Sequence, residues 1–63
     1  MQPHQQRVVD EKTDLDAKLS KLVSFMDTSL YAGLHVDEQT RLKDQAGYMN
    51  SYSDVLGRRI AAF

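Results

Sequence analysis

The chain of 63 residues contains no cysteine, no tryptophan, one proline and two histidines. The absence of cysteine excludes disulfide bonds. His4 and His35, without any thiol, are too few for a closed tetrahedral zinc site, so we expect no metal. No apolar run approaches the length needed to cross a bilayer, which argues against a membrane protein. The polar start MQPHQQR lacks the hydrophobic segment of a secretory signal, so we expect a cytoplasmic protein.

The small size of the chain bears on its stability. We expect one domain over residues 1–63, and a domain this short buries only ~60% of the surface that its unfolded form exposes. Small domains make up this deficit with disulfides, a structural metal or oligomerisation. The first is excluded and the second lacks ligands, so the composition predicts a homo-oligomer, either a dimer or a larger assembly.

The charges are balanced and dispersed. Eight Lys and Arg residues are interspersed with nine Asp and Glu residues, which gives a net charge of −1. Duplex binding depends on cations that neutralise phosphates, so this balance argues against a nucleic-acid partner.

A first helix is predicted at about residues 3–27. Pro3 suits the first position of a helix, because its missing N–H costs nothing there. A narrow apolar seam follows at heptad spacings: Val8, Leu15, Leu19, Leu22 and Met26. Lys12 interrupts this seam, and we expect its stem to lie along apolar surface while its ammonium reaches water.

Residues 28–35 form the predicted connector. Asp27, Thr28 and Ser29 offer capping side chains, Gly33 can adopt a left-handed conformation, and one helical turn is compatible with residues 29–32. We expect three apolar side chains to lie under the helix ends: Leu30, Tyr31 and Leu34. This length is typical of a connection between antiparallel helices.

A second helix is predicted at about residues 36–62. Its apolar stripe consists of Leu42, Ala46, Met49, Leu56, Ile60 and Phe63, and only Ser53 interrupts it. Gly57 allows two interpretations: it either caps the helix before a loose tail, or lies within a continuing helix where it lets another backbone approach closely. Because Leu56, Ile60 and Phe63 stay in phase across Gly57, continuation is favoured. Gly47 is expected on an outward face.

These patterns predict an all-α fold, a two-helix antiparallel hairpin that associates into a helical bundle. The predicted core contains Leu15, Leu19, Leu22, Met26, Leu42, Met49, Leu56, Ile60 and Phe63. Replacing Leu56 with Asp would put an unpaired charge into this core and is expected to unfold the protein.

A second stripe, here called the tyrosine stripe, runs beside the apolar one and consists of Tyr48, Tyr52, Val55 and Arg59. Tyrosine and arginine are enriched at energetically important interface positions, so the stripe is a candidate interaction surface. The alternative is that the rings merely cover the flank of the hairpin itself. Whether the stripe serves self-association or another partner stays open at this point.

Catalytic and ligand-binding motifs are absent. The sequence has no Gly-rich phosphate loop, no Walker lysine, no paired metal motif and no nucleophile elbow, so we expect neither enzymatic activity nor a cofactor. An acidic cluster lacks the loop-forming glycine of a calcium site and is expected to be a solvated face: Asp10, Glu11, Asp14 and Asp16.

Three segments resemble the recurring blocks of a family of small proteins carried by tailed bacteriophages and prophages: Gln6–Lys12, Asp37–Leu42 and Tyr52–Phe63. The length is also similar to that of the short early reading frames between the recombination and excision genes of lambdoid phages. The resemblance implies a non-enzymatic accessory protein that modulates a host process by binding a bacterial protein in the host cytoplasm. It carries no catalytic residue onto this sequence.

Two alternative functions are kept. The first is a small nucleic-acid-binding regulator, for which Arg7 and the pair Arg58 and Arg59 are the only local basic features. The second is a structural helper that stabilises a larger phage assembly.

Overall fold

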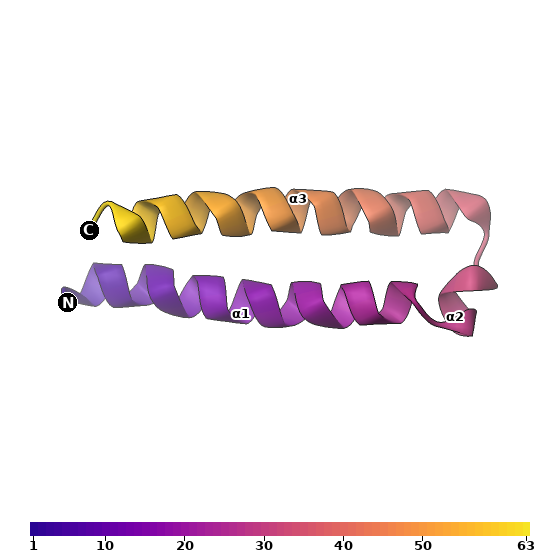
Figure 1. Cartoon of the computed structure of the whole chain (residues 1–63), viewed down its shortest axis with the longest axis horizontal. Coiled ribbons are helices and arrows are strands. Elements are labelled where there is room, and N and C mark those ends of the chain that lie inside the picture. Colours follow the sequence, from indigo (N-terminus) through magenta and orange to yellow (C-terminus); the bar gives the residue numbers. More distant parts are fainter.

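Pro3 begins the first of three helices in the computed structural model, which describes residues 1–63 (Figure 1). α1 spans Pro3–Met26. Ahead of it, the backbone N–H of Gln2 donates to Oε1 of Gln5 at 2.8 Å, so the polar start of the chain caps the helix. α1 ends one residue earlier than predicted, because the N–H of Asp27 turns back to the carbonyl of Ser24 at 3.2 Å.

The connector contains α2, a single turn over Ser29–Ala32, at whose start the Thr28 hydroxyl accepts a hydrogen bond from the N–H of Tyr31 at 3.3 Å. The prediction of a left-handed Gly33 is wrong. Its φ and ψ are −84° and −6°, because its N–H continues the turn by donating to the carbonyl of Ser29 at 3.0 Å. The prediction for Leu30 is also wrong, since this side chain is 72% exposed.

Tyr31 and Gln39 fasten the connector to the long helices. The Tyr31 ring is buried and packs edge-on against Phe25, with ring centroids 6.2 Å apart. Its hydroxyl donates to the carbonyl of Gln39 at 3.1 Å. In return, Nε2 of Gln39 donates to the carbonyls of Tyr31, Ala32 and Leu34 at 3.0, 3.2 and 3.1 Å. These bonds satisfy carbonyls that the end of a short helix leaves free.

α3 spans Val36–Ala61 and runs through Gly57 without a break. His35 caps its start, because Nδ1 accepts a hydrogen bond from the N–H of Asp37 at 3.1 Å. A Cβ atom added at Gly57 would lie 3.6 Å from Cε of Lys12, so the group that approaches this glycine is a side chain rather than another backbone. A Cβ atom at Gly47 would meet nothing within 4 Å.

The predicted all-α antiparallel hairpin is confirmed. α1 and α3 lie side by side in opposite directions, both chain ends lie together, and α2 lies at the far end (Figure 1). Four side chains are buried, Val8, Tyr31, Ser53 and Leu56, and Leu56 alone is completely so. Most of the predicted core is half-buried. Phe63 is 47% exposed, so its assignment to the core is wrong; it lies beyond the end of α3.

The hairpin is long and thin, with extents of 46 × 14 × 13 Å. Its accessible surface of 4691 Å² exceeds the roughly 4100 Å² of a compact monomer of this mass. Its radius of gyration is 14.5 Å, against about 11 Å for a compact chain of this length. A single layer of two helices covers each helix on one side only. None of the helices combines the length and apolar character that a membrane span requires.

Candidate functional site

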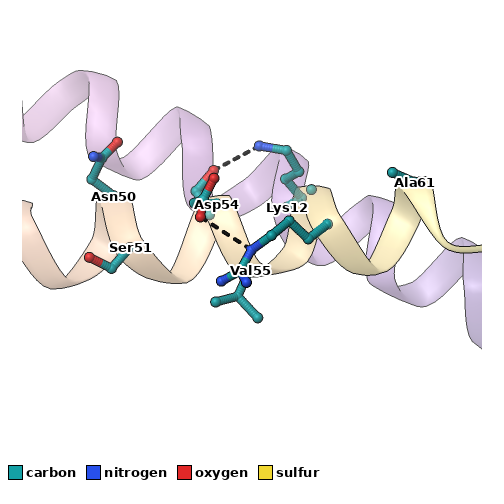
Figure 2. Close-up of a pocket in the computed structure, with 9 residues that line it drawn as sticks. Lys12, Asn50, Ser51, Asp54, Val55 and Ala61 are labelled. Carbon is teal, nitrogen blue, oxygen red and sulfur yellow. Dashed lines mark hydrogen bonds and ion pairs between the residues drawn. The ribbon is translucent and has the colours of Figure 1, made fainter.

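A polar cluster joins the two long helices at the point where both apolar stripes are interrupted. Nζ of Lys12 donates to Oγ of Ser53 at 2.7 Å and pairs with Oδ2 of Asp16 at 3.0 Å. The Ser53 hydroxyl donates to the other carboxylate oxygen of Asp16. Figure 2 shows Lys12 beside α3, with the hydrogen bond drawn as a dashed line. We call these three residues the polar clamp.

The clamp corrects one expectation and refines another. The ammonium of Lys12 does not simply reach water, because it bonds across the helix pair and its side chain is only 31% exposed. The Asp16 side chain is 46% exposed, as expected of a solvated face, but it also accepts a hydrogen bond from the other helix. The hydrogen bond from Ser53, and then that from Lys12, hold the pKa of the Asp16 carboxyl below its ordinary value.

The geometry of the clamp favours a structural role over a nucleophilic one. In a Ser–Lys pair that performs acyl transfer, the lysine must be neutral to accept the serine proton. Here Lys12 is ion-paired with Asp16, and the buried Ser53 directs its own proton to the same carboxylate. Because the cluster needs residues from both helices at one level, it favours this register of α1 against α3 over shifted ones.

The tyrosine stripe lies along an exposed flank of α3. Tyr48, Tyr52 and Val55 are 76%, 45% and 41% exposed, and Arg59 is also exposed. The hairpin therefore covers little of the Tyr48 ring. Arg59 forms no salt bridge within the chain. The stripe combines uncovered apolar area with a cation that has no carboxylate partner.

A groove between the helices opens beside Tyr52. Its walls carry three carboxylates, two cations and one leucine from α1: Arg7, Asp10, Glu11, Asp14, Leu15 and Lys18. Three of the four members of the predicted acidic cluster therefore gather beside the Tyr52 ring. The stripe is thus bordered by negative charge on the neighbouring helix.

A second, polar groove exposes one side of the clamp (Figure 2). It contains Lys12, Asn50 and the ion pair of Arg58 with Asp54, whose N and O atoms are 3.3 Å apart. Its polar groups are largely paired within the chain. Nowhere do three or more His, Asp or Glu side chains gather as a metal site would require.

The sequence showed that Lys12 and Ser53 interrupt the two apolar stripes, but it was not predicted that these two side chains contact each other. The spacing contained the signal, since in an antiparallel hairpin closed by residues 28–35 residue 12 lies opposite residue 51, within one helical turn of Ser53. Gln39 was also missed, because its role depends on three backbone carbonyls of the connector that no side-chain pattern reveals.

Comparison with known proteins gives one match. A family model described as Sequestin matches residues 2–62, which include both long helices and the connector. No curated protein and no solved structure matches the chain.

Proposed function

The chain belongs to the Sequestin family, and from this premise we propose that it is a non-enzymatic accessory protein that acts by protein–protein contact. It is encoded by a bacteriophage or prophage, works in the cytoplasm of the bacterial host, and modulates a host process by binding a host protein. It also associates with itself. Binding without turnover holds a partner in a stoichiometric complex, and the family name Sequestin is compatible with such a role.

The observation that carries this proposal is the exposure of the tyrosine stripe. Scattered apolar side chains are normal on a protein surface, whereas contiguous ones indicate an interaction site. Here two tyrosines, a valine and an arginine follow one another at spacings of four, three and four along one flank of α3. Tyr and Arg are among the residues that contribute most to binding energy.

Self-association is supported by the small core. Only four side chains of the hairpin are buried, and a core of this size supplies little stability to a chain without disulfides. Contact with a second protein surface would bury apolar area that the two-helix layer leaves open.

The test is capture of a host protein by tagged protein from nuclease-treated bacterial lysate. The stripe variant carries Tyr52→Lys with Arg59→Glu. The matched control carries Ser51→Lys with Arg58→Glu, which makes the same change of charge at the same spacing one residue away on α3. Far-UV circular dichroism of all three proteins serves as the control that helicity is retained.

One host protein retained by the parent and by the control, and lost by the stripe variant, would support the proposal. Equal retention by all three proteins would contradict the assignment of the stripe. Recovery of the protein alone, in equal amounts, would contradict host binding and favour the structural helper. Retention of nucleic acid that weakens steeply as salt rises would favour the regulator instead.

A further inference from the structure

We propose that the tyrosine stripe binds a second copy of this chain, with the two α3 helices antiparallel about a two-fold axis at Val55. The inference rests on the proposed function, in which the stripe is the contact surface, and it names the first partner of that surface.

The spacing of the stripe is self-complementary about Val55. Tyr52 precedes Val55 by three residues and Arg59 follows it by four. A helix rises about 1.5 Å per residue, so antiparallel packing brings Tyr52 to within about 1.5 Å, along the axis, of the partner's Arg59. Two-fold symmetry makes each contact twice.

The charges favour the antiparallel arrangement. A guanidinium over the face of a tyrosine is attracted by the ring, and Arg59 has no salt bridge within its own chain. The groove beside Tyr52, which the partner's Arg59 would approach, is lined by three carboxylates and two cations and so carries a net negative charge. In a parallel pair, by contrast, Arg59 would face the partner's Arg59, and like charges would oppose association.

The exposed area also suits a second copy. Aromatic side chains bury roughly 200 Å² each when fully covered, so the exposed parts of Tyr48 and Tyr52 offer roughly 240 Å² per copy. A stable interface buries about 800 Å² per partner, and these two side chains would supply roughly three tenths of it. Val55 at the axis adds apolar area at the centre, where contact energy concentrates.

The chain contains no cysteine, so single engineered cysteines report the register directly. Val55→Cys is expected to form a disulfide-linked dimer rapidly on mild oxidation. The control, Asn50→Cys, is also exposed but lies about 140° around the helix from Val55, and it is expected to stay monomeric in the same time. Tyr52→Cys and Arg59→Cys are expected to crosslink to each other when mixed, and much less when each is oxidised alone.

Sedimentation equilibrium completes the test. The wild type is expected to dimerise, and Arg59→Glu to raise the dimer Kd roughly tenfold, because two cation–π contacts per dimer are lost. Three results would overturn the inference: a monomer at every concentration, equal crosslinking at positions 50 and 55, or Tyr52→Cys crosslinking best with itself. A monomer whose stripe variant still loses a host protein would refute the dimer and leave the proposed function supported.

Discussion

Leu56 is the only side chain that the hairpin buries completely, and its replacement is expected to remove a third or more of the stability of the fold. Truncation of a fully buried leucine to alanine costs about 3 kcal/mol, from lost transfer energy and the cavity left behind. A domain of this length has a free energy of unfolding of roughly 3–9 kcal/mol. Leu56→Ala therefore leaves a marginal protein, and Leu56→Asp, which buries an unpaired charge, is expected to be unfolded.

The assay is urea unfolding followed by far-UV circular dichroism. Val55→Ala is the matched control, because this neighbouring side chain is exposed in the hairpin and its truncation is expected to cost less than about 1 kcal/mol. Since association of folded chains adds apparent stability, each variant is measured over a series of dilutions and compared at the lowest concentration.

Two results would refute the reasoning. Equal urea midpoints for Leu56→Ala and Val55→Ala would mean that the packing of α1 against α3 does not centre on Leu56. A helical, cooperatively unfolding Leu56→Asp protein would remove the basis for the hairpin itself.

Three further predictions follow from individual contacts. The pKa of Asp16 in the fold lies below its ordinary value of 3.8. The contribution of the ionised carboxylate to the free energy of unfolding is therefore complete above pH 3.8 and is lost as the pH falls further. Over this acid range the urea midpoint should drop by more for the wild type than for Asp16→Asn. Gln39→Glu points a carboxylate at three carbonyls, so residues 28–36 should exchange their amide hydrogens faster in Gln39→Glu than in Gln39→Ala. Equal exchange rates in the two variants would contradict this prediction. Gly47→Ala and Gly57→Ala should each raise the free energy of unfolding by about 0.5–1 kcal/mol in urea titrations. The reason is that an added Cβ atom meets open space at position 47 and makes an ordinary van der Waals contact with Lys12 at position 57. A lower free energy of unfolding for Gly57→Ala would contradict this reading of the Lys12 contact.

The hairpin could be predicted from the sequence because its determinants are local. Apolar residues at helical spacing define the facing sides of both helices, Pro3 and the acidic first turn of α3 suit helix starts, and a connector of eight residues forces antiparallel neighbours. The phase of Leu56 and Ile60 likewise predicted that the helix continues through Gly57. The assignment of Phe63 to the core was wrong because this residue lies beyond the last turn of α3, where helical spacing no longer fixes the direction of a side chain.

The polar contacts could not be predicted because they depend on distance across the fold. Lys12 and Ser53 each look like a local defect in an apolar stripe, and only the register of α1 against α3 shows that the two defects satisfy each other. Gly33 was assigned a left-handed conformation from its residue type, yet the hydrogen bond to Ser29 keeps it right-handed. The tyrosine stripe was located by periodicity, but its exposure required the structure.

The most direct measurement is sedimentation equilibrium of three proteins with matched helicity: the wild type, the stripe variant Tyr52→Lys with Arg59→Glu, and the control Ser51→Lys with Arg58→Glu. If the tyrosine stripe is the surface through which two copies of this chain associate and the fold itself does not need it, the wild type and the control will sediment as dimers and the stripe variant as a helical monomer. The same mass for all three proteins would contradict that claim.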